Sequence, residues 1–213
     1  MPRKVRITKE KILEAALGLL IREGYDSVNI NNIARELNCS TQPISWHFGN
    51  MEGLRKALVQ AALEDINKRM VSEANNCINA FWNVGCAYIN LAFDEPNLFR
   101  FIYMGESKLY DRGNVDSILT DKGNRALIED MARYLNISIQ VAGKLVQRMI
   151  IYVHGFVSLV VAGVFTSTKE EAYSLMYEFG KDLLLHSGTD LALLSGTEFD
   201  IESVMSGITI SGE

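Results

Sequence analysis

The sequence predicts an all-α protein with a small N-terminal domain of three helices, residues 1–53, and a larger helical domain, residues 54–188. Two observations predict this fold class. Apolar residues recur at spacings of three and four, the period of an amphipathic helix. Ser, Thr, Asn and Gly, which begin or end helices, stand at the borders of these segments. With 48% apolar and 22% charged residues, the 213-residue chain has the composition of a globular protein with an ample core.

The first predicted helix begins after Thr8, whose hydroxyl can accept an N–H group of the first turn. Its apolar face consists of Ile12, Ala15, Ala16, Leu19 and Leu20. Gly24 ends the helix because glycine tolerates the left-handed conformation. A short basic arm precedes the helix and either lies along a phosphate backbone or is a solvated terminus; it contains Arg3, Lys4 and Arg6.

Two further short helices flank a tight turn. Asn29 can cap a helix of about residues 30–37, and Asn38 lies where the chain must turn. We expect Ser40 to cap a third helix, residues 41–47, with Ile44 and Phe48 pointing inward. The other side chains of this helix then face outward, with Pro43 beside them: Thr41, Gln42, Ser45, Trp46 and His47.

Two short helices around a tight turn form a helix-turn-helix, which places its second helix in the DNA major groove. Gln can pair with an adenine edge, Thr and Pro can contact a thymine methyl group, and His and Ser can reach phosphates. Residues 1–60 carry a net charge of +3 and residues 61–213 a net charge of −8, which favours a phosphate-bearing partner at one end. We therefore expect the six residues above to contact DNA; for Trp46 the alternative is packing on the next helix.

The run from Ile12 to Leu54 resembles the DNA-binding domain of TetR-type transcriptional regulators. The matching features are KILEAAL, Gly24-Tyr25, Ile33-Ala34, Ser40, the segment from Gln42 to Phe48, and Leu54. The resemblance implies a homodimer whose third helix reads a double-stranded DNA operator and whose helical body binds a small-molecule effector. Two positions depart from the family pattern: Ser45 stands where Tyr is common, and Met51 where Lys is usual. Affinity or sequence preference is therefore expected to differ.

The larger domain is also helical by pattern. A long fourth helix begins at Leu54, a fifth spans about residues 77–93, and a short aromatic helix follows Pro96. Another amphipathic helix lies within residues 111–135. Ser138 can cap the long apolar helix that follows. Ser167 and Glu170 can form a capping box at the start of the last major helix. We expect the last two long helices to form the dimer interface, as the resemblance implies. Gly188 ends the last helix, and residues 189–213 form an extension without an assigned role.

Residues 149–168 contain no Asp, Glu, Lys or Arg, so their length meets the threshold for a membrane span. His154 at the centre and the lack of flanking basic clusters favour a buried helix of a soluble dimer. The N-terminus has no apolar core of a signal peptide. The three cysteines, Cys39, Cys77 and Cys86, have neither disulfide-framework nor metal spacing, which indicates a reducing cytoplasm.

An effector pocket would be lined by apolar and aromatic groups, and any of these could equally be ordinary core. The candidates are Trp82, Phe99, Tyr103, Met149, Tyr152 and Phe156. No phosphate loop, nucleophile elbow or metal-ligand spacing indicates an enzyme or a cofactor. The sequence therefore predicts a cytoplasmic, ligand-responsive DNA-binding regulator, most often a repressor in this family. The alternative, which Ser45 and Met51 support, is an interaction protein or coactivator with lost or altered DNA binding.

Overall fold

The computed structural model describes residues 7–70, 77–107, 116–120 and 122–187. All regular elements in these ranges are helical, which confirms the all-α prediction. Contacts divide the chain into two compact units, Met1–Val71 with Asn90–Asp111, and Ser72–Ile89 with Arg112–Glu213. The elements are α1 (Lys9–Glu23), η1 (Tyr25–Ser27), α2 (Ile30–Glu36), α3 (Gln42–Phe48), α4 (Met51–Met70), α5 (Cys77–Asp94), α6 (Pro96–Tyr103), α7 (Ser117–Thr120), α8 (Lys122–Tyr134), α9 (Ile139–Val161) and α10 (Lys169–His186).

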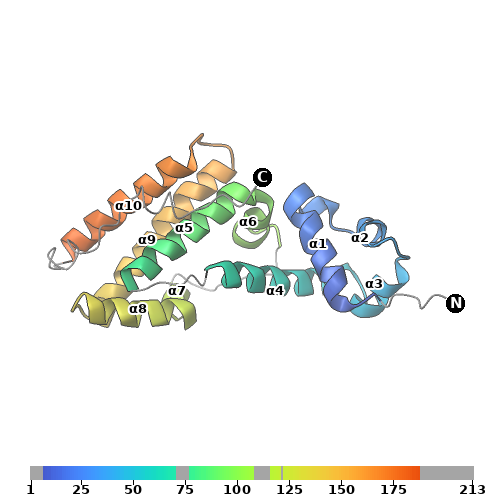
Figure 1. Ribbon diagram of the computed structural model, residues 1–213, viewed down its shortest axis with the longest axis horizontal. Helices are drawn as coiled ribbons and strands as arrows, with labels where there is room; N and C mark the ends of the chain where they lie inside the picture. Colours follow the sequence, from blue (N-terminus) through green and yellow to red (C-terminus); the bar gives the residue numbers. More distant parts are fainter. Residues whose placement is uncertain (1–6, 71–76, 108–115, 121, 188–213) are drawn as a thin grey trace. The chain divides into compact units, whose positions relative to one another are not determined.

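In the first unit, α1 is the central helix and contacts α2, α3, α4 and α6 (Figure 1, blue to green). Its predicted apolar face is the one that packs, since Ile12, Ala16, Leu19 and Leu20 are buried. The predicted caps of α1 and α2 are confirmed. The Lys11 amide donates to the Thr8 hydroxyl at 3.4 Å, and the Asn32 amide donates to Asn29 Oδ1 at 2.9 Å. Gly24 has a φ of 86°, a conformation that glycine adopts without strain.

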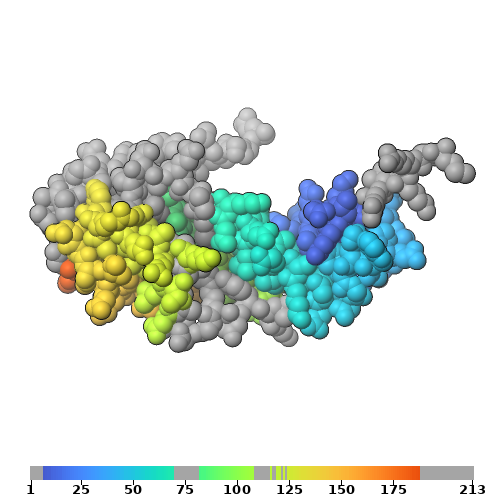
Figure 2. All heavy atoms as spheres, turned by 90° about the horizontal axis from the view of Figure 1, so that it is seen from below, coloured from blue at the N-terminus to red at the C-terminus, as the bar shows by residue number. Residues whose placement is uncertain are grey.

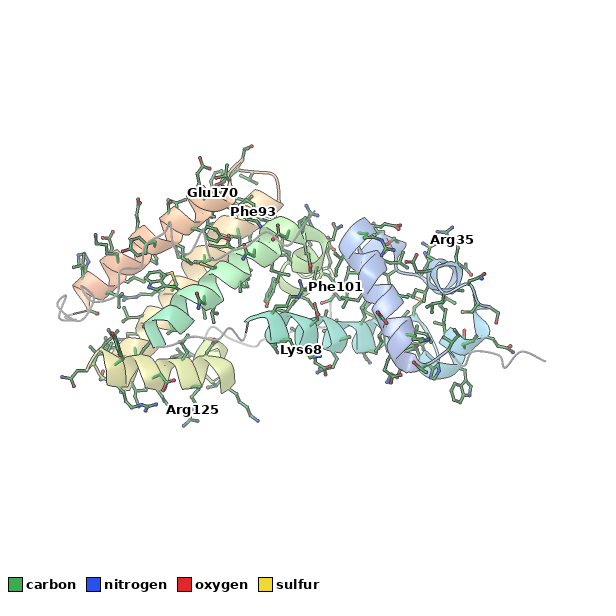
Figure 3. All side chains as sticks on the ribbon, in the orientation of Figure 1. Arg35, Lys68, Phe93, Phe101, Arg125 and Glu170 are labelled. Atoms are coloured by element: carbon green, nitrogen blue, oxygen red, sulfur yellow. The ribbon has the colours of Figure 1, made fainter. Side chains whose placement is uncertain are left out.

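Helices α4 and α6 belong to this unit through long-range contacts. Asn97 on α6 donates to the Ile21 carbonyl of α1 at 3.0 Å. The ring of Tyr25 lies 4.9 Å from that of Phe101, which is labelled in Figure 3, and Arg55 of α4 donates to the Tyr25 hydroxyl. The compact unit is therefore larger than the three-helix module of residues 1–53, because the start of the body folds onto α1.

In the second unit, α9 packs against α8 and α10 (Figure 1, yellow to orange). Helix α5 meets α10 at two glycines. A Cβ atom on Gly180 would lie 2.3 Å from the Trp82 ring and 2.4 Å from Met149, and one on Gly85 would lie 2.4 Å from Met176. These glycines let the helices approach closely. The Tyr88 hydroxyl also lies 2.7 Å from His154 Nδ1 and joins α5 to α9.

Two predicted helix starts are wrong in detail. Helix α3 is preceded by Thr41 in a helical conformation without a side-chain cap, so Ser40 does not cap it. The capping box of α10 is formed by Thr168 and Glu171, one residue later than predicted. Both Ser167-x-x-Glu170 and Thr168-x-x-Glu171 fit the capping-box pattern. Ser167 does not cap the helix; its hydroxyl donates to the Glu171 carboxylate at 2.9 Å. Ser138 caps α9 as predicted, with the Val141 amide at 3.2 Å.

Three expectations concern residues outside the described ranges. These are the basic arm with Arg3, Lys4 and Arg6, the helix stop at Gly188, and the extension of residues 189–213.

Candidate nucleic-acid interface

The turn between α2 and α3 is closed by backbone hydrogen bonds. Asn38 has a φ of 48°, the left-handed conformation expected of this position. The Cys39 amide donates to the Ala34 carbonyl at 2.9 Å and completes the end of α2. Arg35 lies on the outer side of α2 and points away from α1 (Figure 3). The turn therefore redirects the chain within a few residues, so that α3 begins at Gln42.

Helix α3 buries one side and exposes the other. Ile44 is 1% exposed, whereas Trp46 is 72% exposed, the largest value among the exposed large apolar side chains of the described residues. Thr41, Gln42 and Ser45 are exposed, and Pro43 is half-buried. Trp46 does not pack on the next helix; its ring meets the His47 ring edge-on at 4.6 Å. Since exposing an indole to water is unfavourable, this surface has the character of a binding site.

His47 is placed differently from its neighbours on α3. Its ring is half-buried, and Nε2 lies 3.1 Å from the carbonyl oxygen of Ile7, directly before α1. The Lys9 ammonium lies 5.7 Å from the centroid of the Phe48 ring. The sequence did not predict a role for Lys9, because no local pattern links it to Phe48, 39 positions away. Ile7 and Lys9 are thus held against the C-terminal half of α3.

The start of α4 lies beside α3, and both contribute to one surface of the first unit (Figure 2, cyan and teal). The Gly53 amide donates to Asn50 Oδ1 at 2.9 Å, as predicted for a cap. A helix N-terminus carries unpaired N–H groups and a partial positive charge, which suit a phosphate. Met51 is half-buried here, and Lys56 forms an exposed ion pair with Glu52 at 2.8 Å, which lowers the pKa of the Glu52 carboxyl.

The structure does not gather the six effector-pocket candidates around one cavity. Phe99 and Tyr103 lie in the first unit, with ring centroids 5.3 Å apart. Trp82 and Met149 meet at Gly180 in the core of the second unit. Tyr152 stacks on Phe179 at 3.9 Å, and the Phe156 ring lies 6.5 Å from that of Phe165, so all six have packing partners within their own unit.

Phe156 alone among the candidates lines the groove found in the second unit, which has a volume of about 650 Å³ and is open to solvent. Its other walls come from the α9–α10 turn and from α10, including Phe165 and Glu170. Glu170 is labelled in Figure 3. The sequence analysis did not select these residues, because the groove depends on how α10 returns along α9. Within the described residues, no group of three His, Cys, Asp or Glu side chains could hold a metal ion.

Comparisons with known proteins agree with this geometry. Residues 12–58 match the family model for bacterial regulatory proteins of the tetR family. An uncharacterised HTH-type transcriptional regulator of Mycobacterium tuberculosis is 36% identical over 64 residues, 30% of this chain and 29% of that protein. The negative transcriptional regulator IcaR of the biofilm operon in Staphylococcus aureus is 22% identical over 129 residues, 59% of this chain and 68% of that protein.

Among solved structures, a TetR variant from Acinetobacter baumannii in complex with minocycline has the same fold, with a TM-score of 0.54 and 19% identity. The match covers 84% of this chain and 96% of that one. Sequence similarity is therefore concentrated at the helix-turn-helix, while the fold similarity extends through the body. The helix-turn-helix region, residues 12–58, thus belongs to the tetR family of bacterial regulatory proteins.

Proposed function

We propose that this protein is a ligand-responsive, DNA-binding transcriptional regulator. It binds a near-palindromic operator as a homodimer in the cytoplasm, and a small molecule releases it. The observation that carries the proposal is the outer side of α3, where an indole that is 72% exposed lies within the segment that matches the family model. Repression is the favoured direction because the related IcaR is named a negative regulator.

The proposed reading surface is formed by Thr41, Gln42, Pro43, Ser45, Trp46 and His47. Gln42, Ser45 and Trp46 are spaced i, i+3 and i+4, so they lie on one face of α3. The Gln42 amide suits an adenine edge, and Trp46 provides a flat apolar contact. The free N–H groups at the start of α4 can donate hydrogen bonds to a phosphate. Ser45 and Met51 supply neither a phenol nor an ammonium, so affinity or preferred sequence differs from that of relatives with Tyr and Lys there.

The proposed dimer contact is the exposed side of α9 with α10. Helix α9 is long and apolar enough to cross a membrane by length and composition, and 33% of its apolar window is buried. Ile151 and Leu159 are 50% and 39% exposed, and exposed Gly155 lies between them on the same face. A second copy covering this face would bury the apolar stripe. Two reading helices about 34 Å apart then match one turn of DNA.

The proposed effector is largely apolar, in keeping with the side chains that the body offers. The similar structure from Acinetobacter baumannii contains minocycline, which is a property of that protein. The candidates within the second unit, Trp82, Met149, Tyr152 and Phe156, remain the proposed contacts, and no cofactor is invoked. The effector acts by binding more tightly to the conformation that does not fit DNA, so it shifts the population away from the operator-bound state.

The test begins with selection of duplexes from a random pool by the purified dimer. Trp46→Ala and Gln42→Ala are then compared with Tyr134→Ala, a matched change of an exposed aromatic residue on α8 that is 38% exposed. We expect each α3 change to lower affinity for the selected duplex at least about tenfold, which corresponds to 1.4 kcal/mol. The α8 change should leave affinity unaltered. If the wild-type protein enriches no duplex, the interaction-protein alternative replaces this proposal.

A further inference from the structure

The exposed side of α9 is basic in its first half and apolar in its second. Between residues 144 and 159 the exposed positions recur at spacings of three and four, so they form one stripe along the helix. They are Lys144, Arg148, Ile151, Gly155 and Leu159. Neither cation forms an ion pair within the described residues. The stripe therefore offers two free positive charges next to an apolar surface.

The groove near the far end of this stripe is acidic. It has a volume of about 650 Å³, and the described residues that line it include Glu170, Glu171 and Glu178 but no Lys or Arg. Glu171 is held in the capping box of α10, whereas Glu170 and Glu178 form no ion pair within the described residues. Phe165 also lines the groove and is 49% exposed. Carboxylates around an uncovered aromatic ring suit a cation on an aliphatic stem.

Twofold symmetry limits how two copies can place these features. In a symmetric dimer, residue i of one copy meets residue j of the other, and j meets i. Gly155 is the centre of the apolar half, with Ile151 and Leu159 four positions away on either side. A Cβ atom built on Gly155 would meet no described atom within 4 Å, so this point of α9 is open to a close approach. Antiparallel pairing centred there places Ile151 of each copy opposite Leu159 of the other.

The same pairing brings a cation of one copy to the groove of the other. Arg148 lies seven residues before Gly155, about 10.5 Å along the helix, and Ala162 at the α9–α10 turn lies seven residues after it. Arg148 of one copy is then opposite the turn of the other, facing the groove that Glu170 lines. Parallel pairing would instead place Arg148 against Arg148, which like charges disfavour. Charge complementarity thus selects the antiparallel register.

We propose that the acidic groove at the α9–α10 turn is the docking site for Arg148 of a second copy of this chain. Two symmetry-related pairs of Arg148 with Glu170 then flank an apolar contact centred on Gly155. The stem of Arg148 covers the Phe165 ring, while its guanidinium meets the Glu170 carboxylate. This inference rests on the dimer of the proposed function, to which it adds the register and the charge partners.

Charge reversal gives a test in which two weakened variants restore each other. Arg148→Glu places two carboxylates at each contact and Glu170→Arg places two cations there. Each variant alone should therefore raise the dimer dissociation constant at least about tenfold. In a mixed dimer of the two variants, both contacts again join opposite charges. The mixture should form heterodimers with a dissociation constant within about threefold of the wild-type value.

Arg125→Glu is the matched control, because it makes the same change of charge on α8 at a side chain that is 73% exposed. It should leave the dissociation constant unchanged. The constants are measured by sedimentation velocity on the full-length proteins, with one variant fluorescently labelled in the mixture. Thermal unfolding of each variant checks that it is folded.

The possible failures are distinguishable. Wild-type protein that is monomeric at every concentration overturns the proposed dimer and this inference with it. A wild-type dimer that neither reversal weakens overturns this inference alone, as does a mixture no tighter than the separate variants. Should a reversal not fold, Arg148→Gln and Glu170→Gln replace the two reversals. The protein with both changes must then dimerise no more weakly than either single variant, and additive losses refute the pairing.

Discussion

Gly53 offers a sharp test of how the reading helix is joined to α4. A Cβ atom built at Gly53 would lie 2.2 Å from the carbonyl oxygen of Phe48, the last residue of α3. The obstructing atom is backbone, so no side-chain rotation relieves the contact. We predict that Gly53→Ala displaces the end of α3 relative to the start of α4.

The sign of the stability change follows from two opposing effects. Replacing Gly by Ala within a helix stabilises it by about 0.5–1 kcal/mol. Overpacking against a neighbour that cannot yield costs about 1–3 kcal/mol. We therefore expect Gly53→Ala to lower the free energy of unfolding by about 1–2 kcal/mol, and Tm by about 2–8 °C for a chain of this size.

Gly18→Ala is the matched control in the same unit. A Cβ atom there meets only the end of the flexible Arg22 side chain, at 3.1 Å. This variant should gain about 0.5–1 kcal/mol, because the guanidinium can move away. Thermal unfolding and the affinity for a selected duplex are measured for both variants. If Gly53→Ala raises Tm as Gly18→Ala does, the close approach of α3 to α4 is wrong.

Three further predictions address the second unit. Burial raises the pKa of the Cys86 thiol to about 12, so iodoacetamide at pH 8 should label it in unfolded but not in native protein, as mapped by mass spectrometry. Hydrogen bonds from Thr168 and Ser167 lower the pKa of Glu171. The ionised capping box therefore stabilises the fold above pH 4.5, and this stability is lost as the pH falls and Glu171 is protonated. Between pH 6 and 3, the Tm of Glu171→Gln should fall less steeply than that of the wild-type protein. Gly155→Glu should yield monomers in analytical ultracentrifugation, whereas Ala126→Glu on the exposed side of α8 should leave the dimer intact.

Local signals in the sequence were sufficient for much of the fold. The caps at Thr8, Asn29, Asn50 and Ser138 involve a side chain and an amide three positions away, so the sequence alone specifies them. Where two overlapping patterns fit, as at the start of α10, the sequence does not decide the register. The placement of α6 against α1 depends on Asn97 and Ile21, 76 positions apart, which no local pattern reveals.

The two candidate sites differ in how far helical periodicity can predict them. Because Ile44 points inward, the helical period places Trp46 on the opposite, outer side of α3. The exposure of Trp46 could therefore be predicted from residue spacing alone. A pocket has no such signature, because its lining consists of the same apolar residues as the core. Trp82 and Met149 are residue types that often line ligand sites. Here both pack against Gly180 and occupy the space that a side chain at that position would take. A glycine opposite large apolar residues thus indicates tight helix packing in this body. An effector that reached these residues would have to separate α5 from α10, so binding there would itself be a conformational change.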